Sequence, residues 1–278
     1  MGGDGHITDR ASTAYQASTV HRPLEGERPP RGGVLDPVVR SVLDVQDEVR
    51  AAFGWSLDAD RASAEAACTM LDGNAPCGRP SWSPSARTHH LEALRRVVLE
   101  ASAVVVVGAA ASERDVRSAC TPEAVVVAAD GAAGAVGLDL PLVAVVSDLD
   151  GAEHLERAVR RAPTLVLHAH GDNIERWRER LPAWSADVHP LPLVLTHQTP
   201  SPLAGAENPG GFTDGDRAVC LLLALGVPAE RLTLVGFATD HVGPWSGSTD
   251  PDRKRAKLRW MADVLQRLGM PLLNGDEH

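Results

Sequence analysis

The sequence predicts an α/β fold in which a helical N-terminal subdomain precedes a doubly wound, mostly parallel sheet of about six strands. Six short runs rich in β-branched residues follow residue 102, and stretches with helical spacing separate most of them. The runs are apolar almost throughout, which is typical of parallel strands covered on both faces. Right-handed crossovers between such strands place helices on both sides of one sheet. The runs are AVVVVG, AVVVAA, LVAVVS, TLVLHA, LPLVLT and LTLVGF.

The chain before the first strand divides into an arm and a helical part. Residues 1–33 are rich in Gly, Pro, Arg and Ser without periodicity, and they predict a disordered arm. Helical spacing of apolar residues predicts one helix over 34–53 and a second over 58–71, with Asp58 or Asp60 near its start and Gly73 past its end. A third helix is expected in HHLEALRRVVLE. We therefore expect residues 34–101 to form a helical subdomain and residues 102–278 an α/β catalytic domain.

Composition excludes several classes of protein. The net charge of −10 gives no electrostatic support for nucleic-acid binding. The start, MGGDGHITDR, lacks the pattern of a signal peptide, and no apolar run is long enough to span a bilayer. The four cysteines have no short paired spacing, which argues against a zinc knuckle or a disulfide framework. We expect a cytoplasmic protein that binds neither nucleic acid nor membrane; the sequence leaves a homo-oligomer open.

Polar residues follow every predicted strand at the same edge of the sheet. In such sheets ligands bind beyond the carboxyl ends of the strands, so these residues are expected to form one acidic, polar site. The site would repel a polyphosphate unless divalent cations were present. In chain order the residues are Gly108 and Ser112; Asp130 and Gly131; Asp148 and Asp150; His168, His170, Asp172 and Asn173; Thr196, His197 and Gln198; and Gly236 and Asp240.

The string SDLDG, at 147–151, can be interpreted in two ways. If the strand continues through Leu149, Asp148 and Asp150 share a side, and oxygen pairs of this kind suit Mg²⁺. Alternatively, Asp150 caps the helix that starts near Ala152, which accounts for only one of the two carboxylates. The string ADGAAG places Asp130 at another strand end, where the alternative is an ordinary strand-to-helix turn.

Two further strings carry alternatives. HAHGDN resembles the metal motif of metallo-β-lactamases, which would indicate a zinc hydrolase, but those enzymes have an αββα architecture and a further histidine where this chain has Asn173. A buried histidine held by hydrogen bonds is the structural alternative. In NPGGFTDGDRA, Thr213 and Asp216 form a capping-box pattern. The surrounding glycines, Gly215 among them, favour a backbone that passes close to a ligand.

Lysine is rare in this arginine-rich chain. It occurs only at Lys254 and Lys257, three residues apart and therefore on one face of the last predicted helix. Ammonium groups in this arrangement can hold phosphates, and a solvated helix face is the alternative.

Taken together, AADGA, SDLDG, HAHGDN, GGFTDGDRA, GFATDHVGPWS and KRAKLRW resemble the archaeal 6-hydroxymethyl-7,8-dihydropterin pyrophosphokinase family (MptE-like). Their order and spacing match from about residue 103 onward, and the two helices between about 34 and 71 are also similar to that family. The family's catalytic domain, Rossmann-like in its winding, is itself similar to that of thiamin pyrophosphokinase.

The resemblance implies Mg²⁺-dependent transfer of diphosphate from ATP to a reduced hydroxymethylpterin, in coenzyme biosynthesis of the tetrahydromethanopterin or folate type. It implies that Asp148, Asp150 and Asp216 bind the metal, and that Arg217, Lys254 and Lys257 neutralise phosphate charge. The catalytic set is Asp148, Asp150, Asp172, Asp214 and Asp216. Nucleotide or substrate contacts are expected from Gly108, Ser112, Asp130, Gly131, His168, His170, Asn173, Gln198, Phe212, Thr213, Arg217, Trp245, Lys254 and Lys257.

The chain departs from the family pattern in the nucleotide loops. A Gly-Pro-Ser turn is expected after the first strand, where this chain has GAAASER; Ala238 stands in place of an Asp, and Pro244 in place of a Lys. The remaining alternatives are a thiamin pyrophosphokinase-like enzyme and a non-catalytic Mg²⁺–nucleotide-binding protein.

Overall fold

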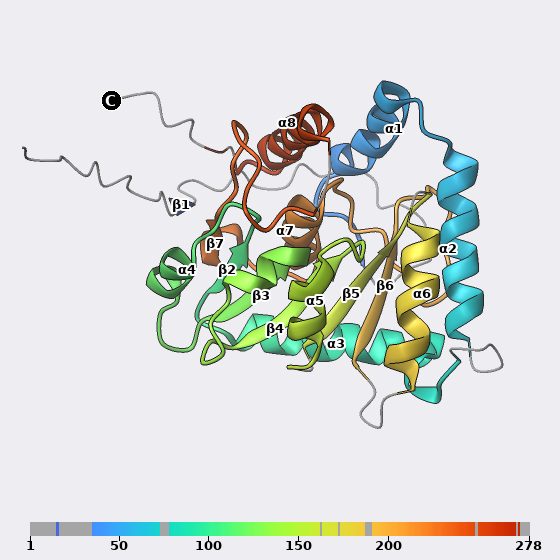
Figure 1. Cartoon of the computed structure of the whole chain (residues 1–278), viewed down its shortest axis with the longest axis horizontal. Coiled ribbons are helices and arrows are strands. Elements are labelled where there is room, and N and C mark those ends of the chain that lie inside the picture. Colours follow the sequence, from blue (N-terminus) through green and yellow to red (C-terminus); the bar gives the residue numbers. More distant parts are fainter. Residues whose placement is uncertain are drawn as a thin grey trace, which may run out of the picture.

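The computed structural model describes residues 15–16, 35–72, 78–161, 163–171, 173–186, 191–247, 250–270 and 272. Six parallel strands lie in the order β7-β2-β3-β4-β5-β6, and the short β1 (Tyr15–Gln16) pairs antiparallel with β7 at the edge. The predicted α/β fold with six parallel strands is therefore confirmed (Figure 1). The strands are β2 (Val104–Val107), β3 (Val125–Ala129), β4 (Leu142–Ser147), β5 (Thr164–Ala169), β6 (Leu193–His197) and β7 (Leu232–Val235).

Both faces of the sheet are buried because helices cover each of them. On one face, Val105 and Val107 of β2 pack in a core with α2 (Leu57–Leu71), α4 (Glu113–Ala119), α5 (Ala152–Val159) and α6 (Ile174–Ser185). On the other face, Val104 and Val106 pack with α3 (Pro84–Glu100), α7 (Asp214–Ala224) and α8 (Pro251–Arg267). This two-sided burial is the physical reason for the unbroken valine runs.

The helices before the sheet pack directly on the rest of the molecule. Helix α1 (Ser41–Phe53) lies against α7 and α8, where Val45 and Val49 form a small core with Cys220 and Val264. Helices α2 and α3 cover β5 and β6 on opposite faces of the sheet. None of the described helices combines the length and apolarity that crossing a bilayer requires.

Two helices begin at other residues than the sequence predicts. Helix α1 begins at Ser41 rather than near 34. In α2 the N-cap is Ser56, whose Oγ accepts a hydrogen bond from the Ala59 N–H at 3.3 Å, while Asp60 lies inside the helix and is buried. Serine satisfies a free N–H of the first turn as well as aspartate does. Gly73 and most of the expected N-terminal arm lie outside the described residues.

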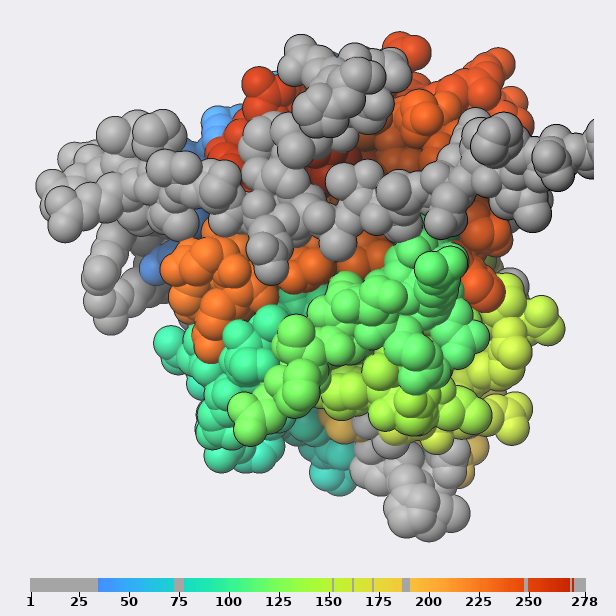
Figure 2. All heavy atoms as spheres, turned by 90° about the vertical axis from the view of Figure 1, so that its left-hand side faces the viewer, coloured from blue at the N-terminus to red at the C-terminus, as the bar shows by residue number. Residues whose placement is uncertain are grey.

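The winding places a crevice between β2 and β7. The chain passes from β2 through β6 in spatial order and then returns by α7 to insert β7 beside β2. Ligands of doubly wound sheets bind at such a switch point, beyond the carboxyl ends of the strands. In the space-filling view from this edge, the β7–α8 segment, in orange and red, lies against the green residues that contain β2, β3 and α4 (Figure 2).

Candidate active site

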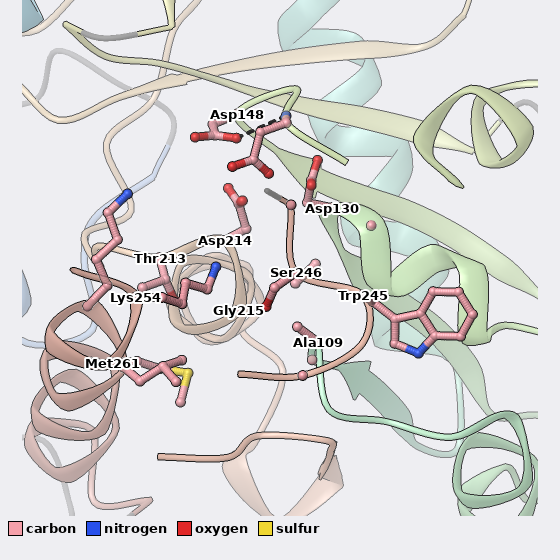
Figure 3. A pocket seen from close by; sticks show the side chains of 18 of the residues that line it. Ala109, Asp130, Asp148, Thr213, Asp214, Gly215, Trp245, Ser246, Lys254 and Met261 are labelled. Atoms are coloured by element: carbon pink, nitrogen blue, oxygen red, sulfur yellow. Dashed lines mark hydrogen bonds between the residues drawn. The ribbon is translucent and has the colours of Figure 1, made fainter. Parts of the chain in front are cut away.

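A pocket opens at the carboxyl ends of the strands, as the strand-end residues predict. The loops after β2, β3, β4, β5, β6 and β7 all contribute to its lining, together with the start of α7 and one face of α8. Acidic side chains from the ends of β3 and β4 converge at its centre, with Asp214 beside them and Lys254 facing them from α8 (Figure 3). Six loops thus meet at one acidic pocket.

The segment Ser147–Asp150 forms a turn rather than an extension of β4. Leu149 has φ 71° and is fully buried, so the strand does not continue through it as the sequence interpretation assumed. The Leu149 N–H donates to Ser147 Oγ at 2.8 Å, and the Asp150 N–H donates to Asp148 Oδ1 at 3.2 Å. A leucine in the left-handed region costs about 1–2 kcal/mol, and such strain gathers at functional sites.

The turn brings three carboxylates together. Asp130, Asp148 and Asp150 each offer an oxygen atom, and these atoms lie within 4.8 Å of one another. Asp130 adopts φ 45° at the end of β3 and accepts a short hydrogen bond from Ser147 Oγ. Burial and the neighbouring Asp214 and Asp150 raise the pKa of Asp130 well above its usual value. The raised pKa indicates that too little positive charge surrounds Asp130 to favour its ionised form.

The alternative of a helix cap at Asp150 is not what the structure contains. The N-cap of α5 is Gly151, and no side chain caps this helix. Both aspartates of SDLDG are thus available to the carboxylate group, and hard oxygen donors of this kind suit Mg²⁺.

Asp148 is held by His170 and Arg176 on its other side. His170 Nε2 and Arg176 Nη1 each lie 3.2 Å from Asp148 Oδ2. Burial alone would raise the pKa of Asp148, but the hydrogen bond from His170 and the charges of His170, Arg176 and Lys257 outweigh it and lower the pKa to about 2. Asp148 is therefore ionised, while Asp130 retains a proton more readily. His170 acts as a partner of a carboxylate, not as a member of the carboxylate group.

Helix α7 presents Asp214 to the pocket and turns Asp216 away from it. Asp214 lines the pocket, and burial together with the charges of Asp148 and Asp150 raises its pKa well above the usual value. Asp216 is fully buried, and its Oδ1 accepts hydrogen bonds from the Phe212 N–H and the Thr213 hydroxyl. The resemblance implies Asp216 as the third metal ligand beside Asp148 and Asp150. Among the described residues, the third carboxylate close to these two is that of Asp130.

The glycines before and within α7 have structural roles that the sequence interpretation missed. Gly210 and Gly211 adopt φ 90° and 82°, and a Cβ on Gly210 would lie 2.5 Å from the side chain of Val42 in α1. A Cβ on Gly215 would lie 3.0 Å from the ring of Phe237. The closest approaches to Gly210 and Gly215 are therefore to protein atoms, although Gly215 also lines the pocket.

The loops at the β2–β7 end interlock through their backbones. Gly236 has φ 74°, and a Cβ there would lie 2.0 Å from the Ala111 N atom. A Cβ on Gly131 would lie 2.4 Å from the Trp245 carbonyl oxygen. The walls of this end combine main chain and small side chains with Phe237 and Trp245, and the main chain suits close approach of phosphate oxygens to backbone N–H groups.

Of the nineteen residues to which the resemblance gives a catalytic, metal or binding role, fourteen line this pocket. Four others lie outside its lining, and Asp172 lies outside the described residues. The lining residues are Gly108, Asp130, Gly131, Asp148, Asp150, His168, His170, Gln198, Phe212, Thr213, Asp214, Trp245, Lys254 and Lys257.

The four residues outside the lining form helix caps and hydrogen bonds to the backbone. Ser112 caps α4 in a reciprocal capping box with Asp115. The Asn173 amide donates to the carbonyl oxygens of His168 and Asp148, at 2.6 and 3.2 Å. The Arg217 guanidinium is fully buried and donates to the carbonyl oxygens of Gly210 and Phe212, while Asp216 holds the start of α7.

The pocket contains a residue, Trp55, that no sequence motif predicted. Trp55, from the connection between α1 and α2, lines the pocket although it stands far from every strand-end motif. Trp245, in contrast, lines the pocket with its indole turned away from the acidic side chains (Figure 3). That indole donates to the Ala111 carbonyl oxygen at 2.7 Å and packs edge-on against His154.

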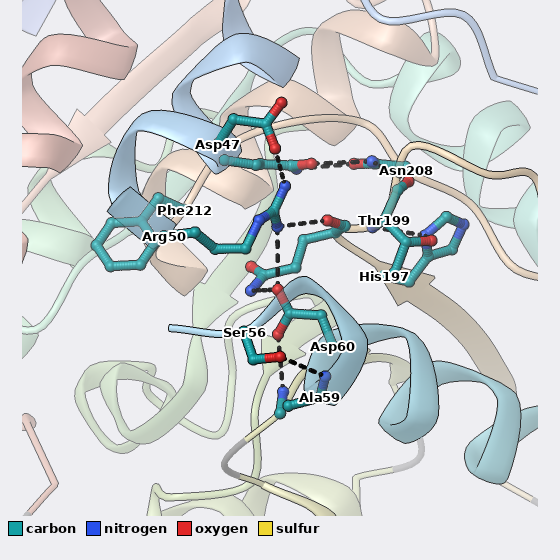
Figure 4. A network of polar contacts seen from close by, with 12 residues as sticks. Asp47, Arg50, Ser56, Ala59, Asp60, His197, Thr199, Asn208 and Phe212 are labelled. Atoms are coloured by element: carbon teal, nitrogen blue, oxygen red, sulfur yellow. Dashed lines mark hydrogen bonds and ion pairs between the residues drawn. The ribbon is translucent and has the colours of Figure 1, made fainter. Parts of the chain in front are cut away.

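A buried polar network fixes the β6 side of the pocket (Figure 4). Asp60 accepts hydrogen bonds from Arg50 at 3.0 Å, the Gln198 side-chain amide at 2.8 Å and the Gly171 N–H at 2.9 Å. The Arg50 guanidinium also donates to the Gln198 carbonyl oxygen at 3.0 Å. Helices α1 and α2 thereby determine the position of Gln198, whose Oε1 lies 3.4 Å from His168 Nε2.

Comparison with known proteins identifies homologues over about half of the chain, and no protein-family model matches it. The chain is 40% identical over 152 residues to the 6-hydroxymethyl-7,8-dihydropterin pyrophosphokinase of Pyrococcus furiosus, covering 51% of this chain and 61% of that protein. It is 36% identical over 159 residues to the protein of that name from Methanothermobacter thermautotrophicus, covering 52% and 64%. A third, from Methanocaldococcus jannaschii, is 39% identical over 94 residues, covering 34% and 37%. The match thus spans less than two thirds of each relative.

Proposed function

We propose that this homologue of the archaeal 6-hydroxymethyl-7,8-dihydropterin pyrophosphokinases transfers diphosphate from ATP to 6-hydroxymethyl-7,8-dihydropterin in the presence of Mg²⁺. The observation that carries the proposal is the group of three carboxylates, Asp130, Asp148 and Asp150, opposite two lysines in one pocket. Phosphoryl transfer needs positioning and charge neutralisation more than covalent help, and this pocket is equipped for both.

The carboxylate group fits a divalent cation. At an effective dielectric constant of about 20, two ionised carboxylates at the 4.8 Å limit of this group would repel each other by about 3 kcal/mol. Burial first, and the charges of Asp214 and Asp150 after it, raise the pKa of Asp130. Asp130, Asp148 and Asp150 would hold Mg²⁺, which supplies charge neutralisation for the ATP phosphates when bound.

The chain's own cations complete the charge balance. Lys257 lies close enough to help lower the pKa of Asp148, and Lys254 acts in the same direction on Asp214. Both lysines line the pocket, and Lys254 extends from α8 towards the carboxylates (Figure 3). They would neutralise the charge that develops on the phosphate oxygens as AMP leaves.

The transfer itself exchanges one P–O bond for another. The hydroxymethyl oxygen of the acceptor attacks the β-phosphorus of ATP, the bond from that phosphorus to the oxygen that bridges it to the α-phosphorus breaks, and AMP leaves. The proton of the hydroxyl group passes to a carboxylate. Asp214 is suited to accept it because it lines the pocket beside the carboxylate group, and burial, which raises its pKa, makes the ionised carboxylate a stronger base.

Formation of AMP from ATP, with Mg²⁺ and reduced hydroxymethylpterin, tests the proposal. Asp148→Asn and Asp150→Asn should each lower kcat by at least about a hundredfold. Both should also weaken the binding of Mn²⁺, which electron paramagnetic resonance measures. Asp58→Asn is the matched control, because the Asp58 side chain is 90% exposed at the start of α2.

Other outcomes would support other functions. AMP formed with thiamin but not with the pterin would indicate a thiamin pyrophosphokinase-like enzyme. Tight binding of Mg²⁺–ATP without AMP under any of these conditions would indicate a nucleotide-binding protein. Turnover that survives in both variants would refute the metal assignment.

A further inference from the structure

An aromatic cluster closes the end of the pocket opposite the β2–β7 crevice. It consists of Phe53 at the end of α1, Trp55 in the following connection and Phe212 before α7. Phe53 stacks on Trp55 with ring centroids 4.8 Å apart, and Trp55 lies 5.9 Å from Phe212. Trp55 and Phe212 both line the pocket and remain partly exposed. Phe53 covers one face of Trp55, and Arg253 and Lys257 also lie over this ring, 5.5 and 5.6 Å from its centroid, so the exposed part of the cluster is bordered by cations.

The two ends of the pocket differ in chemistry. The β2–β7 end combines main chain at Gly108 and Gly236 with the ring of Phe237, which lies against Gly108. The β5–β6 end combines Trp55 and Phe212 with His168 and Gln198, and the carboxylates of β3 and β4 lie between the two ends. Close-packed backbone suits phosphates, whereas aromatic faces with a few polar groups suit a planar heterocycle.

Lys257 connects the aromatic cluster to the carboxylates. Its ammonium nitrogen lies 5.6 Å from the ring centroid of Trp55 and 5.9 Å from that of Phe212, within the range of cation–π attraction. The Lys257 side chain lines the pocket together with Asp148. A ring bound beside Trp55 would therefore lie in the same pocket as the carboxylate group.

We infer that the acceptor heterocycle binds at the β5–β6 end beside Trp55 and Phe212, and that Trp55, from the N-terminal helices, determines acceptor specificity. The inference rests on the proposed function. The nucleotide then occupies the β2–β7 crevice, on the other side of the carboxylate group. The order of the strands thus sets the order of the ligands along the pocket.

Steady-state kinetics of Trp55→Leu tests the inference. Leucine keeps apolar volume but removes the aromatic face, so KM for the hydroxymethyldihydropterin should rise about tenfold, equivalent to about 1.4 kcal/mol. KM for ATP should change less than twofold. Trp55→Phe should restore most of the acceptor affinity. Trp260→Leu is the matched control, because Trp260 packs in the α1–α7–α8 core and is not among the residues that line the pocket.

Calorimetric titration with the oxidised analogue 6-hydroxymethylpterin, without ATP, gives a readout independent of turnover. It should show the same tenfold loss of affinity in Trp55→Leu, while thermal unfolding verifies that the variant is folded. Absence of AMP from the wild-type protein would overturn the proposed function and with it this placement. AMP formation with an unchanged acceptor KM in Trp55→Leu, or a rise confined to the ATP KM, would overturn the placement alone.

Discussion

Asp60→Ala is expected to destabilise the protein strongly, although Asp60 is not among the residues that line the pocket. The Asp60 side chain is 4% exposed and accepts three hydrogen bonds, from Arg50, Gln198 and Gly171. Its removal leaves the Arg50 guanidinium, 8% exposed, without its buried counter-charge. Breaking a buried ion pair on one side costs about 3–5 kcal/mol, a large part of the 5–15 kcal/mol by which a protein is stable.

Asp47→Ala supplies the matched control for this prediction. Asp47 pairs with the same guanidinium, but its side chain is 75% exposed, so its loss should cost less than about 1 kcal/mol. Urea unfolding at pH 7, followed by circular dichroism, measures both free energies. Replacing the pair together, as Arg50→Met with Asp60→Leu, should cost less than Asp60→Ala alone. An Asp60→Ala protein within 1 kcal/mol of Asp47→Ala would refute the reasoning.

Three further predictions concern single side chains. Burial, followed by the charge of Arg217, lowers the pKa of His197 to about 4, so the unfolded chain binds more protons than the folded one between pH 6.5 and 4. The free energy of unfolding should therefore fall by about 3 kcal/mol on acidification through this range. Urea unfolding at a series of pH values should show this loss in the wild-type protein and not in His197→Asn. Ser112→Ala should lower the free energy of unfolding by about 1 kcal/mol through loss of the α4 cap, and a KM for ATP raised more than twofold would contradict its role as a cap only. Gly236→Ala should lose at least 2 kcal/mol, because the new Cβ meets the Ala111 backbone; an unchanged melting temperature would argue against the interlocked loops.

The fold could be predicted because its signals are local and periodic. Valine runs such as 104–107 are buried on both faces of the sheet, and nothing but a covered parallel strand accounts for them as simply. Helix starts were less accessible, since Ser56 and Asp58 are both competent caps and the choice depends on packing. The sequence also predicted that Asp148 and Asp150 converge with other strand-end residues in one pocket.

The composition of the site depended on backbone geometry that no periodicity encodes. The left-handed conformation of Leu149 turns Asp150 towards Asp130, and a sequence pattern assigns leucine to no such conformation. Trp55 reaches the pocket only because α1 packs on α7 and α8, a contact between segments far apart in the chain. The packing of the glycines around α7 could not be predicted because their neighbours, Val42 and Phe237, come from other elements.

The return of β7 to the side of β2 has a consequence for how the molecule assembles. Val104 pairs with Leu232, so the two strands that enclose the crevice belong to opposite ends of the α/β segment. Contacts between such distant residues slow folding, since the intervening chain must first be ordered at an entropic cost. Recovery of nucleotide binding after dilution from denaturant is therefore expected to lag behind recovery of helical signal. A ligand present during refolding would act on the final strand insertion, and it would favour the completed sheet by mass action.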